Sequence, residues 1–348
     1  MEKAPSDQQK LDFYYNKFVE KVTKNSLSIY PLVAIPRSSS TILSNCLMRS
    51  DSFDNYFHEP FTPLSKVHLT PELLAEKKDL SYKNLYNSVT KSSQNSRMLI
   101  KVMAAWVGYN NNEYIRFYST IQTPPLFIIR DPILTTASRM RKVIETFELR
   151  YKETIITTLI SLLGEKYNKR QFSLNYQQNL LNDYARSEGF SDWRTLVTYI
   201  TNNNDFKTVE PFLLNIDIYN NNTFSGIHAV EQQVGHLTSL GRDLRIVDST
   251  VLRSDPQKIL HQICNFWDIK YDHSMLSWGS NETFIDLGQQ KKEYQKIWYK
   301  KAKESNCWYP PESKIPDINK FPMHIKKYIK NKDFPAYERL MKNRDLLA

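Results

Sequence analysis

Short, mostly apolar runs alternate with helical stretches in the first part of the chain and again near its end. The runs at 28–35, 98–104, 126–130 and 244–247 have the length and composition of buried strands. Amphipathic stretches with a helical repeat fill the intervals between them. Strands that alternate with helices predict an α/β fold with a central parallel sheet flanked by helices on both faces.

Helices and one short extended piece are expected around these strands. The extended piece at 53–57 leads into His58 and Glu59. The expected helices of this part are 6–25, a helix that follows residues 36–41 and runs to about residue 49, 71–90, 112–120 and 255–267.

The middle of the chain has a mainly helical pattern and no strand alternation. Helices are expected there at 152–163, 171–187, 191–201 and 228–240. We therefore predict three parts, which are the first part of an α/β core (1–147), a helical insertion (148–240), and the return of the core with a C-terminal tail (241–348).

The charge of the chain narrows the range of ligands. Lys and Arg outnumber Asp and Glu by 47 to 37, which gives a net charge of +10. Such a chain suits anionic small molecules, nucleic acid or a membrane surface. The basic residues are dispersed and form no recognition-helix, zinc-finger or RNP pattern, so nucleic acid is not the expected partner.

Neither a membrane segment nor a metal or disulfide framework is expected. No apolar run approaches the roughly 18 residues of a membrane span, and the polar N-terminus has no secretory signal, so we expect a cytoplasmic protein. Cys46, Cys264 and Cys307 lie far apart, and no His, Asp or Glu spacing is typical of a metal site.

Residues 36–41 connect the first expected strand to its helix and read P-R-S-S-S-T. The hydroxyl residues are Ser38, Ser39, Ser40 and Thr41. Hydroxyl groups and the N–H groups of a helix N-terminus attract a phosphate or sulfate, and Arg37 adds a planar cationic fork. The alternative is an ordinary Ser/Thr helix cap. The loop is not a Walker A motif, because its glycines and lysine are absent.

A second anion element follows the strand at 126–130. The strand ends at Arg130, and Pro132 suits the first turn of a helix. Ser138 lies eight residues after Arg130, about two helical turns along, so the two side chains could converge on one anion. Because both elements lie at the carboxyl ends of strands, we expect them to share one crevice.

Together these elements resemble the P-R-S-x-S-T and R-D-P-x5-S motifs of the sulfotransferase family. Three further segments are similar to the family: an H-E-P-F element at 58–61, a late strand, D-P turn and helix at 244–267, and a C-terminal W-Y region at 298–308. The resemblance implies a P-loop-like sulfotransferase fold.

The resemblance also implies 3′-phosphoadenosine 5′-phosphosulfate (PAPS) as the sulfuryl donor. In the family the first element, here Arg37 and 38–41, holds the 5′-phosphosulfate. The second element, here Arg130 and Ser138, holds the 3′-phosphate. The family's usual loop has glycine where this chain has Ser39. Because glycine is favoured where the backbone needs a positive φ, this difference bears on loop geometry and affinity.

Sulfuryl transfer needs a general base that takes the proton of the acceptor. Glu59 is the candidate, because related sulfotransferases place a Glu about as far beyond the loop, and burial is expected to raise its pKa. His58 is the alternative, because cytosolic members of the superfamily use His. Adjacent strand residues point to opposite faces, so only one of the two is expected to reach the substrate. A structural role for both also stays open.

Lys101 places a charge inside the apolar strand at 98–104. It either reaches the transferred sulfate as an electrophile or faces solvent at the strand end, since a buried lone lysine is costly. Arg37 and Lys101 would together neutralise the leaving phosphate, so no metal is expected.

The sequence thus predicts a PAPS-dependent sulfotransferase that transfers a sulfuryl group by in-line displacement. The acceptor would be a hydroxyl or amine of a small molecule, peptide or glycan, and 148–240 would form its lid. A small-molecule kinase or nucleotide-processing enzyme with the same loop is one alternative, although ATP lacks the 3′-phosphate that the second element suits. A non-catalytic nucleotide-binding module is the other.

Overall fold

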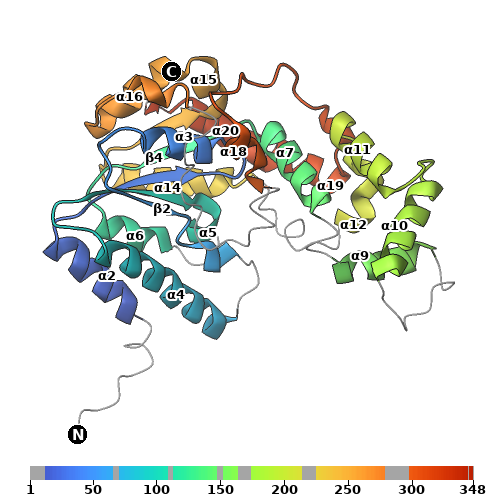
Figure 1. The fold of residues 1–348 in the computed structure, drawn as a ribbon, viewed down its shortest axis with the longest axis horizontal. Coiled ribbons are helices and arrows are strands. Elements are labelled where there is room, and N and C mark those ends of the chain that lie inside the picture. The colour runs from blue at the N-terminus through green and yellow to red at the C-terminus, as the bar shows by residue number, and fades with distance from the viewer. Residues whose placement is uncertain are drawn as a thin grey trace, which may run out of the picture. The chain divides into compact units, whose positions relative to one another are not determined.

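The chain forms two compact units in a computed structural model. The structure describes residues 12–65, 70–108, 113–146, 152–163, 174–213, 225–278, 298–343 and 345–347 (Figure 1). The sheet unit comprises Met1–Asp131, Ser225–Glu312 and Pro335–Ala348. The helical unit comprises Pro132–Phe224 and Ser313–Phe334.

The sheet unit contains a six-stranded sheet in which all neighbouring strands are parallel. The strands are β1 (Ser28–Ala34), β2 (Asn55–His58), β3 (Arg97–Met103), β4 (Leu126–Ile129), β5 (Arg245–Asp248) and β6 (Leu346–Leu347). Their order is β2-β3-β1-β4-β5-β6. The predicted α/β fold with a central parallel sheet is therefore confirmed. β6 is the strand that the sequence pattern did not indicate, because two residues carry no periodicity.

Helices cover both faces of this sheet. The helices around it are α2 (Phe13–Lys24), α3 (Ser40–Leu47), α4 (Pro71–Thr90), α5 (Ala104–Gly108), α6 (Glu113–Thr120), α14 (Ile227–Ser239), α15 (Ser249–Ser254), α16 (Pro256–Trp267), α18 (Lys300–Glu304) and α20 (Phe334–Met341), with short 3-10 turns η1 (Thr62–Ser65) and η3 (His273–Met275). Figure 1 shows α2, α4 and α6 on one side and α3 and α16 on the other.

β1 shows why two layers of helices are needed. Its side chains alternate between two separate apolar cores. Ile29 and Val33 belong to the core that α2, α4, α6 and α14 complete. Leu32 and Ala34 belong to the core that α3, α15 and α16 complete. A strand buried on both faces in this way explains the continuous apolar run in the sequence.

The helical unit is described by itself. Its helices are α7 (Pro132–Glu145), α9 (Lys152–Leu163), α10 (Leu174–Ser187), α11 (Trp193–Asn203), η2 (Phe206–Val209), α12 (Glu210–Leu213), η4 (Ile318–Lys320), α19 (Met323–Tyr328) and η5 (Ile329–Asp333). Its core includes the rings of Phe206 and Phe321, whose centroids are 5.3 Å apart. The unit begins at Pro132, whereas the predicted insertion begins at 148. α14, which falls inside that predicted insertion, is part of the sheet unit.

The strand order places a natural binding edge at the carboxyl end of β1. β1 lies between β3 and β4. The chain leaves β1 toward β2 at one edge of the sheet and leaves β4 toward β5 in the direction of the other edge. Ligands of open parallel sheets bind outside the carboxyl ends of the strands at such a switch point. Residues 36–41, 59 and 130 all follow strand ends at this edge. None of the helices in the ranges given above is long and apolar enough to cross a membrane.

Candidate active site

The loop between β1 and α3 adopts a strained backbone. Arg37 and Ser39 have φ values of 62° and 64°, in the left-handed region that favours glycine. Ser39 immediately precedes α3, and its side chain makes no capping hydrogen bond to the helix. An ordinary serine cap is therefore not what this loop forms. An uncapped first helical turn favours the anion-binding interpretation of the loop.

The remaining hydroxyl groups of the loop are buried. Ser38 Oγ donates a hydrogen bond of 2.8 Å to the Ile35 carbonyl, which closes the turn after β1. Ser40 and Thr41 lie in the first turn of α3 and are 5% and 9% exposed. Ser38 thus shapes the turn, while the first turn of α3 and Arg37 remain the groups suited to hold an anion.

Lys101 is buried and joins the loop to the carboxyl end of β2. Its Nζ donates to Thr41 Oγ1 at 2.9 Å and lies 2.8 Å from Glu59 Oε1. Its side chain is only 3% exposed. Of the two positions open to Lys101, solvent at the strand end is excluded, and the lysine pairs with a carboxylate of the protein itself. This pairing offsets the cost of burying the charge.

His58 and Glu59 reach the same place, which the strand alternation did not predict. β2 ends at His58, and Glu59 has a φ of 52° while its N–H donates to the Lys101 carbonyl at 3.0 Å. The left-handed residue breaks the alternation of the strand. As a result His58 Nε2 lies 3.3 Å from Glu59 Oε1. The expectation that the two side chains point to opposite faces is therefore wrong, and which of them reaches the substrate stays a prediction.

Two tyrosines surround the imidazole of His58. Its Nδ1 lies 2.5 Å from the hydroxyl of Tyr56, and its Nε2 lies 3.1 Å from the hydroxyl of Tyr299. Tyr299 also hydrogen-bonds Glu59. Sequence reasoning did not include Tyr299 in the site, although the similarity of the W-Y region to the family was the available signal.

The pKa of Glu59 is lower than its ordinary value. Burial acts to raise this pKa. The charges of Lys101 and His58, together with hydrogen bonds from Lys101 and Tyr299, lower it by more than burial raises it. Burial acts in the expected direction, but the expected net rise of the Glu59 pKa is wrong, because Lys101 lies in contact with the carboxylate. Glu59 is consequently ionised at neutral pH and able to accept a proton.

Arg130 is attached to the loop through its guanidinium group. Its Nη1 donates to the Arg37 carbonyl at 2.6 Å, and Arg37 Nη1 donates to the Trp298 carbonyl at 2.9 Å. Arg130 Nη2 is also 2.5 Å from Glu312 Oε1, and Glu312 Oε2 is 2.7 Å from Arg253 Nη1. The two predicted anion elements therefore meet at Arg37. Arg253 and Glu312 were missed, because no sequence pattern links them to Arg130.

Ser138 is the remaining predicted site residue. It lies on α7 and is partly buried within the helical unit. Its pairing with Arg130 on one phosphate stays a prediction.

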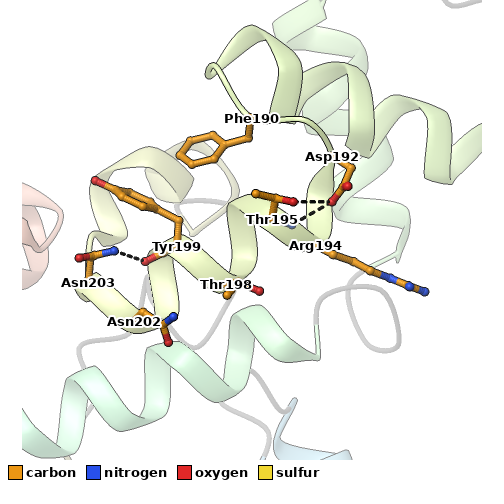
Figure 2. Close-up of a pocket in the computed structure, with 8 residues that line it drawn as sticks. All are labelled: Phe190, Asp192, Arg194, Thr195, Thr198, Tyr199, Asn202 and Asn203. Atoms are coloured by element: carbon orange, nitrogen blue, oxygen red, sulfur yellow. Dashed lines mark hydrogen bonds between the residues drawn. The ribbon is translucent and has the colours of Figure 1, made fainter.

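A surface hollow lies elsewhere, in the helical unit (Figure 2). Its lining residues all come from α11 and the turn before it, and none of the predicted site residues is among them. Asp192 Oδ1 accepts the Thr195 N–H at 2.9 Å and so caps α11. Asp192 and Thr195 thus have a structural use in the hollow, and so does Asn203, whose Nδ2 donates to the Tyr199 carbonyl at 3.0 Å.

The sheet, the loop and the buried polar cluster define an α/β protein with a candidate anion site at the carboxyl edge of a parallel sheet. Comparison with known families gives a match to the model described as Sulfotransferase domain over residues 227–341. The match confirms the resemblance to the sulfotransferase family and supports a sulfotransfer function, hence a transferase enzyme. The searches of curated proteins and of solved structures give no match.

The matched stretch contains the family-like segments at 244–267 and 298–308, but both anion elements and the H-E-P-F element precede it. Residues 227–341 include Arg253, Tyr299 and Glu312, whereas the loop at 36–41 and Glu59 precede the match. The structure brings both parts to one edge of the sheet through the hydrogen bonds of Arg37 and His58.

The strained loop gives a prediction for stability. Ser39→Gly should raise the free energy of unfolding by up to about 1 kcal/mol. A left-handed residue with a side chain costs roughly 1–2 kcal/mol, which glycine would relieve. The greater conformational freedom of glycine in the unfolded chain offsets about half of this gain in stability. Urea denaturation measures the change. The control is Ser119→Gly, at an exposed position of α6, which should lose about 0.5 kcal/mol. Equal losses in both variants would contradict a strained Ser39.

Proposed function

We propose that the protein is a PAPS-dependent sulfotransferase with Glu59 as its general base. The observation that carries the proposal is the buried chain Thr41–Lys101–Glu59, which joins an anion-binding loop to a carboxylate at the same edge of the sheet. An anion site with an adjacent base is what transfer of a charged group to a hydroxyl or amine requires.

The donor groups at this edge suit a nucleotide with phosphates at two positions. Arg37 and the N-terminus of α3 follow β1, and Arg130 follows the neighbouring strand β4. PAPS would supply the sulfuryl group together with a 5′-phosphate leaving group and a 3′-phosphate. In this proposal the 5′-phosphosulfate is bound by Arg37, Ser39, Ser40 and Thr41. The 3′-phosphate is bound by Arg130.

The residues of the chain then position groups and move one proton. Glu59 accepts the proton of the acceptor, and Lys101 keeps the carboxylate ionised and fixed in direction. His58 and Tyr299 bracket Glu59 and orient the acceptor hydroxyl or amine. Positioning and fixed charge supply most of the catalysis in such loose displacements. A small-molecule, peptide or glycan acceptor, the lid function of 148–240 and a cytoplasmic location stay predictions.

Ligand-induced stabilisation tests the identity of the donor. The product 3′,5′-ADP (PAP) should raise the melting temperature, whereas AMP and ATP with magnesium should raise it less. At a hundredfold excess over its dissociation constant, PAP should add about 2.7 kcal/mol of stability. A shift with ATP and magnesium but none with millimolar PAP would contradict PAPS as the donor and would favour a kinase.

The role of Glu59 as general base is tested by a substitution that should lower turnover and leave the affinity for PAP unchanged. Glu59→Gln should lower turnover by about 10²–10⁴-fold, because the amide cannot accept the proton. PAP release from PAPS with a panel of phenols and alcohols measures turnover, and calorimetry measures PAP affinity. His58→Gln should lower turnover less.

An exposed glutamate of α2 provides the matched control, since Glu20→Gln should change neither quantity. If both variants fold and His58→Gln lowers turnover more than Glu59→Gln does, His58 is the base. If Glu59→Gln retains full turnover, the proposed role of the carboxylate is wrong.

A further inference from the structure

A carboxylate bridges two arginines beside the anion loop. Glu312 Oε1 is 2.5 Å from Arg130 Nη2, and Glu312 Oε2 is 2.7 Å from Arg253 Nη1. The side chains of Arg130 and Arg253 are 5% and 10% exposed, whereas that of Glu312 is 33% exposed. Each carboxylate oxygen of Glu312 thus pairs with one arginine, and Glu312 is the more exposed partner in both pairs.

Both arginines are held in place by contacts other than Glu312. Arg130 Nη1 donates to the Arg37 carbonyl at 2.6 Å. Arg253 Nε donates to the Tyr309 carbonyl at 3.1 Å, and Arg253 Nη2 donates to the Pro310 carbonyl. Neither cation therefore depends on Glu312 alone for its position. The pair is a preformed clamp for an anion, since backbone carbonyls fix both of its guanidinium groups.

The charges favour a dianion over the resident carboxylate. Two guanidinium groups carry two positive charges, and Glu312 supplies one negative charge. The Glu312 pKa is lowered despite burial, because Arg130 and Arg253 stabilise its ionised form, so the bridge is ionic at neutral pH. A phosphate group with a charge near −2 and three acceptor oxygens matches the two arginines better.

We infer that Arg253 and Arg130 together form the subsite for the nucleotide 3′-phosphate, and that Glu312 occupies this subsite as an internal competitor which the phosphate displaces. This inference rests on the proposed function, because PAPS is the source of the 3′-phosphate. Arg253 thereby becomes a specificity-determining residue for 3′-phosphorylated nucleotides. Glu312, being the most exposed member of the bridge, moves into water when the phosphate binds.

Calorimetric titration of the full chain with PAP and with AMP tests the inference. Glu312→Gln removes the competing charge and should tighten PAP binding about tenfold, while AMP binding stays within about twofold. Arg253→Gln removes a charge-assisted contact and should weaken PAP binding tenfold or more, again with little change for AMP. Glu338→Gln, at an exposed position of α20, and Arg194→Gln, at an exposed position of α11, are the matched controls.

The outcomes separate this inference from the proposed function. If wild type prefers PAP to AMP but neither variant alters that preference, the inference is wrong and the proposed function stands. The inference is also wrong if Arg253→Gln weakens PAP binding and AMP binding equally. If wild type and Glu312→Gln both bind PAP no more tightly than AMP, the proposed function itself fails. Should Glu312→Gln unfold, the Arg253→Gln titration still decides, because a 3′-phosphate contact predicts a loss confined to PAP.

Discussion

The buried ion pair between Lys101 and Glu59 is the constraint on which the site depends. Desolvating two charges costs several kcal/mol, and the cost is offset only by good geometry and further hydrogen bonds. Thr41 supplies one of those bonds and Tyr299 another. Removing either partner would leave an uncompensated buried charge. The pair therefore holds β3, the end of β2 and the first turn of α3 in one arrangement.

Backbone strain gathers at the same edge of the sheet. Arg37, Ser39 and Glu59 all have left-handed backbone conformations without being glycine. Each such residue costs of order 1–3 kcal/mol and persists only where its surroundings determine it strongly. Here the surroundings are the loop contacts of Arg130 and the ion pair of Lys101. The left-handed backbone turns Glu59 toward the loop, so that the proposed base lies beside the candidate anion site.

Much of the fold followed from hydrophobic periodicity, because β1 and β4 are buried on both faces and leave continuous apolar runs. The loop and Lys101 were visible as polar residues at strand ends or inside a strand. The convergence of His58 and Glu59 could not be predicted from the sequence, because it depends on the φ angle of Glu59, which breaks the strand alternation. Arg253 and Glu312 escaped for another reason. Glu312 pairs with Arg130, 182 residues earlier, and with Arg253, 59 residues earlier, and periodicity carries no information on such pairs.

A double-mutant cycle between Lys101→Met and Glu59→Gln tests the central claim most directly. The measured quantity is the free energy of unfolding in urea for wild type, both single variants and the double variant. Because each single variant leaves the opposite group buried without its partner, the account predicts a coupling of about 1–3 kcal/mol, with the double variant less destabilised than the sum of the two single changes. Losses that add to within about 0.5 kcal/mol would contradict the ion pair as the interaction that organises the site.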